Sequence, residues 1–212
     1  MKETLLNLFF PPKCPFCRRI LREASRCPHC AKTLPWNEEP LRRGSGYGVC
    51  AVPLRYEGAV RGAILRYKFQ GCCAGVPLFA RLMTQCVAEE LSGAFDCITW
   101  VPVSRKRRRR RGFDQSELLA QAMAQYWGTT AQAMLEKYVD NPPQSSLKEA
   151  SARRGNVLGV YRPKPEAEIA GKRILLVDDI VTTGATLTAC AEELRLAGAD
   201  AVVCCALATA TV

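Results

Sequence analysis

The segment Ile174-Leu-Leu-Val-Asp-Asp-Ile-Val-Thr-Thr-Gly-Ala-Thr186 gives the clearest indication of the fold of this 212-residue chain. Its continuous apolar start, residues 174–177, is typical of a buried parallel strand. Two adjacent carboxylates follow, then a short loop of threonine and glycine, and then a segment with helical periodicity over 186–197. Strand, loop and helix in this order indicate an open α/β sheet, in which ligands bind at the carboxyl ends of the strands.

The flanking sequence continues the same alternation of strands and helices. It predicts further strands at 49–56, 95–103, 133–139 and 201–208, and helices at 57–69, 76–91 and after Asp114. Asp114 is expected to cap its helix, with Glu117 three residues later completing a capping box. We therefore expect an α/β fold with a doubly wound, mostly parallel sheet and helices on both faces.

The residues around the acid pair predict the kind of ligand. A helix start preceded by a glycine-containing loop offers free backbone N–H groups to a phosphate, and the loop threonines add hydroxyl donors. Asp178 and Asp179 can accept hydrogen bonds from sugar hydroxyls but repel a phosphate placed beside them. A ligand with a phosphate at one end and a vicinal diol nearby fits this layout; the alternative is an ordinary strand-to-helix turn.

The stretch resembles the motif with which type I phosphoribosyltransferases bind phosphoribosyl pyrophosphate (PRPP): a hydrophobic strand, Asp-Asp, two residues, and Thr-Thr-Gly-x-Thr. The resemblance implies that Asp178 and Asp179 hold the ribose 2′- and 3′-hydroxyls and act in catalysis. It also implies a loop that wraps the 5′-phosphate, formed by Thr182, Thr183, Gly184, Ala185 and Thr186. Mg²⁺ is expected to accompany PRPP, held mainly by the ligand's own oxygens and by water.

Further segments extend the resemblance over nearly the whole chain. They are Tyr67-Lys-Phe-Gln-Gly71, Val101-Pro-Val103, Arg111-Gly-Phe-Asp-Gln-Ser-Glu-Leu-Leu-Ala120 and residues 144–156, together with a cysteine-rich head. In this order they are similar to the ComF/GntX family of competence-associated, phosphoribosyltransferase-like proteins, some of which are linked to DNA uptake. Family members commonly show Gly-Phe-Asn-Gln. Here Asp114 replaces that asparagine, and we interpret it as the helix cap.

A run of seven cations at 105–111 supplies most of the formal net charge of +10. It follows the strand end Val-Pro-Val, where related transferases hold pyrophosphate, so Ser104, Arg105 and Lys106 are the nearest candidates for that role. Two alternatives stay open. Many of these side chains are expected to form a solvated surface, and the run could contact single-stranded DNA or the DNA-uptake machinery non-specifically.

Residues 144–156 occupy the place of the flexible catalytic loop of related transferases. Such a loop closes over PRPP and excludes water, and Arg153 is our catalytic candidate there because it brings positive charge to the leaving group. An ordinary surface loop is an equally good interpretation. Lys68 is a weaker candidate for the acceptor side, since a solvated lysine at a helix end explains it equally well.

The head, residues 1–45, contains two knuckles, Cys14-Pro-Phe-Cys17 and Cys27-Pro-His-Cys30. Four thiolates favour a structural, tetrahedral Zn²⁺, with His29 a neighbour and not a ligand. An iron–sulfur cluster lacks its usual spacing, and thioredoxin-like chemistry lacks its βαβ context. Cys50 stands alone, which makes a second metal site doubtful. Residues 46–212 are expected to form the phosphoribosyltransferase-like domain.

Bulk composition agrees with a globular protein, with 48% apolar and 24% charged residues. The apolar stretch at the N-terminus is too short for an export signal, and no window approaches the ~20 apolar residues of a membrane span. The expected compartment is therefore the cytoplasm, where thiols stay reduced. Two functions remain: phosphoribosyl transfer to an unknown acceptor with pyrophosphate release, or a non-catalytic accessory protein that senses PRPP or binds single-stranded DNA.

Overall fold

A computed structural model describes residues 11–21, 27–139 and 159–210. Its main sheet has the order β1-β2-β8-β7-β4, with β3 also paired to β8. The strands are β1 (Leu41–Gly44), β2 (Gly48–Ala51), β3 (Leu54–Arg55), β4 (Cys97–Trp100), β7 (Arg173–Val181) and β8 (Ala201–Thr209). All pairings are parallel except that of the edge strand β1 with β2. The expected mostly parallel sheet is confirmed.

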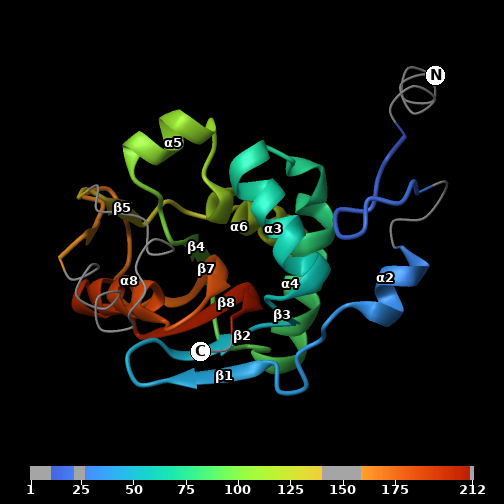
Figure 1. Cartoon of the computed structure of the whole chain (residues 1–212). Helices are drawn as coiled ribbons and strands as arrows, with labels where there is room; N and C mark the ends of the chain where they lie inside the picture. Colours follow the sequence, from blue (N-terminus) through green and yellow to red (C-terminus); the bar gives the residue numbers. More distant parts are fainter. Residues whose placement is uncertain (1–10, 22–26, 140–158, 211–212) are drawn as a thin grey trace.

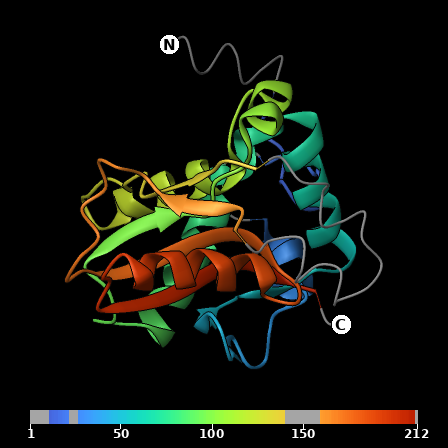
Figure 2. The ribbon, with the colours of Figure 1, turned by 90° about the vertical axis from the view of Figure 1, so that its left-hand side faces the viewer.

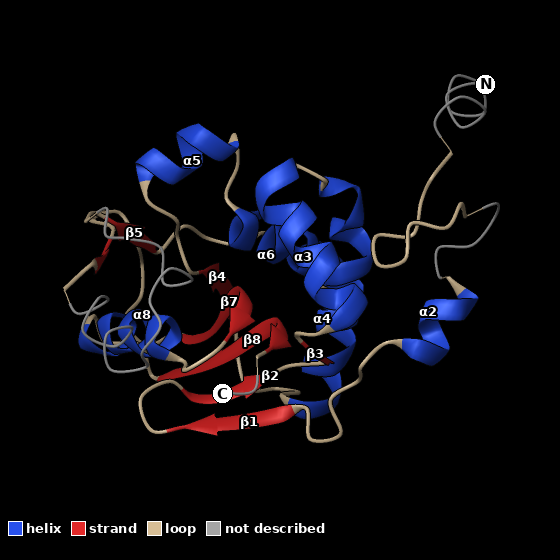
Figure 3. Ribbon diagram, in the orientation of Figure 1, coloured by secondary structure: helices blue, strands red, loops and turns tan. Residues whose placement is uncertain are grey.

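Helices cover both faces of this sheet (Figure 3). They are α2 (Pro28–Thr33), α3 (Gly58–Gln70), α4 (Val76–Glu90), α5 (Arg105–Arg111), α6 (Gln115–Tyr126) and α8 (Ala185–Leu196), with a short 3₁₀ turn at Cys73–Gly75. Figure 1 shows α3, α4 and α6 on one side of the sheet and α8 on the other. In Figure 2, α8 lies in front of the sheet. A small antiparallel pair, β5 (Leu135–Lys137) and β6 (Tyr161–Pro163), stands apart from the main sheet.

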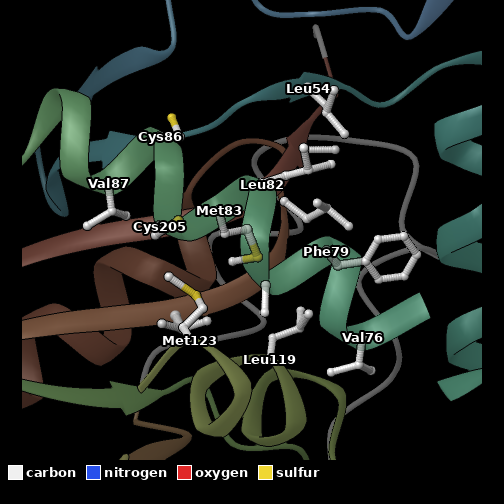
Figure 4. Close-up of a cluster of buried hydrophobic side chains, with 14 of the residues drawn as sticks. Leu54, Val76, Phe79, Leu82, Met83, Cys86, Val87, Leu119, Met123 and Cys205 are labelled. Carbon is white, nitrogen blue, oxygen red and sulfur yellow. The ribbon is translucent and has the colours of Figure 1, made fainter. Parts of the chain in front are cut away.

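Two hydrophobic cores lie on the two faces of β7. Leu175 and Val177 belong to the core beneath α3, α4 and α6, whereas Ile174 and Leu176 belong to the core beneath α8. Figure 4 shows the first core, in which Met83 of α4 meets side chains of α6 and β8. Burying side chains of this size stabilises a fold by about 1.5–3 kcal/mol each. The alternation along β7 therefore fixes which helix covers which face.

The acid pair lies within a strand, whereas the sequence predicts a strand that ends at residue 177. β7 continues to Val181 because β8 pairs with it along its whole length, matching Asp178 with Ala206 and Val181 with Thr209. Aspartate is disfavoured in strands, but pairing with a neighbouring strand overrides that preference.

Two other predicted strands are shorter than expected. The strand predicted at 49–56 is divided into β2 and β3 at Val52-Pro53, since proline has no N–H for the ladder. The strand predicted at 95–103 is reduced to β4, and the one at 133–139 to β5.

The basic run forms the helix α5, which the sequence did not predict. Ser104 caps it by accepting a hydrogen bond from the Arg107 N–H, and Gly112, with φ 83°, ends it in the left-handed conformation. Arginine is a good helix former, and a cap at each end stabilises so short a helix despite its like charges. Figure 1 shows α5 projecting at the top of the view.

The hairpin β1–β2 crosses the expected boundary between residues 45 and 46. Leu41 pairs with Ala51 and Gly44 with Gly48, and β2 in turn pairs with β8. The last residues of the expected head are therefore attached to the main sheet. Among the helices that the structure describes, none is both long and apolar enough to span a membrane.

Candidate functional site

The four knuckle cysteines gather in one cluster, with their Sγ atoms all within 4.8 Å of one another. Sγ of Cys14 is 3.5 Å from Sγ of Cys30, and that of Cys17 is 3.7 Å from that of Cys27. A tetrahedral zinc with Zn–S distances of about 2.3 Å separates its sulfurs by ~3.8 Å. The cluster therefore fits a structural Zn²⁺, and none of the chain's cysteines is in a disulfide. His29 is exposed and lies outside this group, as predicted.

The first knuckle is attached to the body of the protein through α3. The Arg66 guanidinium donates hydrogen bonds to the carbonyl oxygens of Pro15 at 2.7 Å and Phe16 at 3.0 Å. The Phe16 ring packs on Phe79 of α4, with 5.5 Å between ring centroids. These contacts place the cysteine cluster beside α3 and α4.

Asp178 and Asp179 are largely buried, with 9% and 6% of their surfaces exposed. Asp178 Oδ1 accepts a hydrogen bond from the Ser116 hydroxyl at 2.9 Å. Asp179 Oδ1 lies 2.8 Å from the Lys68 ammonium. Both acids therefore have a partner within the protein, which the sequence did not predict.

Each carboxylate keeps a second oxygen for a further contact. Within the described residues, neither Asp178 nor Asp179 uses its Oδ2 atom in a hydrogen bond or ion pair. Burial raises the pKa of Asp178 to about 7, and the negative charge of Asp179 adds to that effect. Lys68, the Asp179 N–H and the Ser116 hydroxyl act in the opposite direction. Burial thus favours the protonated form of Asp178, and these three groups favour the ionised form.

The threonine-rich loop follows at the end of β7. Gly184, with φ 78°, precedes the first helical residue of α8, Ala185, whose N–H is 3.4 Å from Thr183 Oγ1. The buried ring of Tyr47, from the β1–β2 turn, lies against this loop. A Cβ atom at Gly184 would approach Tyr47 Cε1 to 2.2 Å. Sequence reasoning did not find Tyr47, because nothing local in its segment indicates that contact.

Asp114 is the cap of α6, as predicted. Its Oδ1 accepts hydrogen bonds from the N–H groups of Ser116 at 3.0 Å and Glu117 at 3.2 Å, and its Oδ2 accepts one from Val103 at 2.8 Å. Burial raises its pKa to about 6. The Glu117 carboxylate pairs with Arg108 at 3.0 Å, so the salt bridge replaces the expected capping box.

Some side chains of the basic run contact other parts of the protein, and most of the run is exposed to solvent. Arg108 pairs with Glu117, and Arg111 lies over the Phe69 ring, 5.1 Å from its centroid. Five of the seven are exposed, which confirms the expected solvated surface. A pocket of about 610 Å³ opens between α5 and the β5–β6 pair; it is lined by Ser104, Arg105, Lys106, Arg109, Glu136, Lys137, Tyr138 and Arg162.

The three pyrophosphate candidates therefore lie together in one pocket. That pocket's lining includes neither the acid pair nor the threonine-rich loop. Arg153 and the rest of 144–156 lie outside the described residues. The sequence also missed the contact between Ser116 and Asp178, although Ser116 belongs to a segment that carries the family resemblance.

Comparisons with known proteins agree with this architecture. Residues 104–211 match the family model of the phosphoribosyl transferase domain, and residues 5–62 match that of the double zinc ribbon domain. Among the described residues, the second match contains one four-cysteine cluster; beyond residue 30 its only cysteine is Cys50, which is buried in β2.

Curated relatives resemble the chain over most of its length. Competence protein ComFC of Streptococcus pneumoniae is 33% identical over 177 residues, covering 82% of this chain and 76% of that protein. DNA utilization protein YhgH of Salmonella typhimurium is 29% identical over 198 residues, covering 89% and 86%. Competence protein F of Haemophilus influenzae is 25% identical over 196 residues, covering 88% and 86%.

Proposed function

Because this chain belongs to the ComF/GntX family of competence-associated proteins with a phosphoribosyltransferase domain, we propose that it binds PRPP with Mg²⁺ and transfers the phosphoribosyl group to an acceptor. One observation carries the proposal: the acid pair and the N-terminus of α8, capped by Gly184, lie at the carboxyl end of the same buried strand, β7. That is the place in an open α/β sheet where ligands bind. It offers acceptors for a diol and N–H donors for a phosphate.

In the proposed reaction, the lone pair of the acceptor forms a bond to C1 of the ribose with inversion. The bond from C1 to the pyrophosphate oxygen breaks, pyrophosphate leaves with that electron pair, and the acceptor loses a proton. Asp178 and Asp179 hold the ribose hydroxyls, and the loop at 182–186 holds the 5′-phosphate. When bound, Mg²⁺ neutralises the charge of the leaving pyrophosphate.

The same proposal assigns the pyrophosphate to cationic groups on the other side of the ribose. Ser104, Arg105 and Lys106 are the described candidates, and Arg153 is the candidate in the loop at 144–156. Cationic and hydroxyl donors stabilise a leaving pyrophosphate, which supports this assignment. In this proposal the zinc head, residues 1–45, is structural, the transferase domain is 46–212, and the protein acts in the cytoplasm in connection with DNA uptake.

Ligand binding tests the proposal directly. PRPP with Mg²⁺ is expected to raise the melting temperature of the purified protein, whereas ribose without phosphates is not. The variant Asp178→Asn/Asp179→Asn is expected to lose the shift, because amides accept weaker hydrogen bonds than carboxylates do. Pyrophosphate release across a panel of nucleobases and amines then identifies the acceptor. An unchanged melting temperature with PRPP and Mg²⁺ contradicts the proposal.

A second candidate function, binding of single-stranded DNA, rests on the pocket beside α5. Arg105, Arg109 and Arg162 line it, with Glu136 paired to the first and the last of them. Tyr138, which is 55% exposed, has one face of its ring under the Arg162 guanidinium, 4.7 Å from the centroid. Cations for the backbone and aromatic rings for the bases are the usual elements of single-strand binding. This alternative requires no turnover.

Fluorescence anisotropy with a labelled oligonucleotide tests the second candidate. Affinity is expected to fall steeply with salt, and to disappear when Arg107–Arg111 are neutralised. Tyr138→Ala is expected to weaken binding less, with the salt dependence unchanged. Binding that survives neutralisation of the arginines counts against this function and leaves the transferase proposal untouched.

A further inference from the structure

The last turn of α3 connects several parts of the molecule. Arg66 bonds the first zinc knuckle, and the next three residues contact the region of the candidate PRPP site. Tyr67 donates a hydrogen bond to the Gln115 carbonyl at 2.7 Å, and Lys68 pairs with Asp179 at 2.8 Å. Phe69 lies under the Arg111 guanidinium. This turn lies outside the matched phosphoribosyl transferase domain, which begins at residue 104.

The ion pair between Lys68 and Asp179 is largely removed from water. The side chains are 20% and 8% exposed, respectively. The neighbouring Tyr67 is fully buried and packs its ring on Phe113, with 5.6 Å between centroids. The backbone that carries Lys68 is therefore fixed by the packing of the residue before it. A solvated lysine at a helix end does not describe this geometry.

Several charged and titratable groups surround Asp179. Lys68 reaches it from α3, and Arg111 of α5 interacts with it electrostatically. Asp178 is its neighbour on β7, and Asp114 and the Tyr67 hydroxyl lie on the same side of the sheet. Lys68 is the group in direct contact. Its charge opposes the repulsion between the two adjacent carboxylates and lowers the pKa of Asp178.

We propose that Lys68 is a positioning residue of the PRPP site: its ammonium group, 2.8 Å from Oδ1 of Asp179, holds this carboxylate in an orientation in which Oδ2 can accept a ribose hydroxyl. The inference rests on the proposed function. A carboxylate that is already held in its binding orientation loses less conformational freedom when the ligand binds, so Lys68 increases the affinity of the site without touching the reacting atoms. Its positive charge also favours an anionic ligand.

The test compares Lys68→Met with Lys68→Arg and with the wild type. The affinity for PRPP with Mg²⁺ is measured by calorimetry from pH 6 to pH 9. Lys68→Met is expected to weaken binding about 10- to 100-fold at pH 7, as expected for losing a charge-assisted hydrogen bond, and to recover part of it at high pH. Lys68→Arg keeps the charge and is expected to stay within about threefold of the wild type.

A matched control removes another lysine–carboxylate pair. Lys172 directly precedes the first residue of β7 and pairs with Glu168. Lys172→Met breaks this pair and is expected to leave PRPP affinity unchanged. If Lys68→Met does not fold, Lys68→Gln replaces it, because an amide of similar length can still bond to Asp179. Wild-type affinity and an unchanged pH profile in Lys68→Met, or in Lys68→Gln where it replaces Lys68→Met, overturn the inference. Tighter PRPP binding by Lys68→Met overturns it too, because the Lys68 ammonium would then compete with the ribose hydroxyl for the Asp179 carboxylate.

A second measurement separates this inference from the proposed function. Carbon-13 NMR of the aspartate carboxyl groups reports their titration without any ligand. Lys68→Met is expected to move the titration of Asp178 to higher pH, because the Lys68 charge lowers the pKa of this carboxyl, and Lys172→Met is not. If the wild type fails to bind PRPP, the proposed function fails. If the titration of Asp178 does not move, the role given to Lys68 fails.

Discussion

Replacing Asp114 by asparagine should make the stability difference from the wild type depend on pH. Burial raises the pKa of this carboxyl from 3.8 to about 6 in the folded protein. A raised pKa means that folding favours the protonated form. The wild type therefore has this contribution in full below about pH 4 and loses it as the pH rises through 6. Asparagine does not titrate, so the free energy of unfolding of Asp114→Asn should increase relative to that of the wild type as the pH rises from about 4 through 6.

The magnitude follows from the shift in pKa. A change from 3.8 to about 6 corresponds to about 3 kcal/mol, and about 1.4 kcal/mol of it falls between pH 5 and pH 8. A constant loss of about 1–3 kcal/mol is added, because an amide cannot accept hydrogen bonds through both of its polar atoms. The N–H groups of Val103 and of the first turn of α6 both need an acceptor. That loss does not vary with pH.

Urea unfolding followed by tryptophan fluorescence at pH 5, 6.5 and 8, with zinc held constant, measures the difference. Asp114→Ala is the control: it should show the same pH dependence relative to the wild type with a larger constant loss, since alanine accepts no hydrogen bond. A difference in unfolding free energy between wild type and Asp114→Asn that stays constant from pH 5 to pH 8 would contradict a raised pKa of Asp114 in the folded protein. So would a slope of opposite sign.

Three further predictions concern the metal, the acid pair and the phosphate loop. Denatured protein should release one zinc per chain to a colorimetric chelator, and Cys17→Ser should lower this yield; two zinc ions per chain would contradict the single cluster. Ser116→Ala should raise the pKa of Asp178, because it removes a hydrogen bond to the charged form, and should weaken PRPP binding at pH 7 about 3- to 10-fold with recovery at pH 8.5. A variant with wild-type affinity across this range contradicts that role. Gly184→Ala should destabilise the fold by more than about 1 kcal/mol in urea unfolding, because its φ is positive and Tyr47 occupies the space of a Cβ; an equally stable variant rules out this packing.

The class of fold and the loop at the end of β7 could be predicted from the sequence because local residue patterns indicate both. The continuous apolar run at 174–177 is typical of a buried strand, and the apolar stripe after it has the 3.6-residue period of a helix. Sequence reasoning misplaced the end of β7 because the length of a strand depends on its partner. β8 continues to Thr209, and β7 pairs with it beyond the acid pair, as far as Val181. Sequence reasoning missed α5 because seven like charges do not show a helical period.

The partners of the acid pair could not be predicted from local patterns. Ser116 is separated from Asp178 by 62 positions in the chain, and Lys68 is still more distant from Asp179. Lysine near a helix end is common on protein surfaces, so its residue type gives no indication of burial. Tyr47 is likewise brought to Gly184 by the pairing of β2 with β8. Such contacts come from topology and are visible only in three dimensions.

The hairpin β1–β2 has a consequence for attempts to isolate the transferase domain. A fragment that starts at residue 46 lacks β1, so the outer backbone groups of β2 would become an unprotected sheet edge. Exposed edges of this kind pair with other chains and promote aggregation. A fragment that starts before Leu41 retains the strand that covers this edge, and should remain monodisperse where the shorter one precipitates.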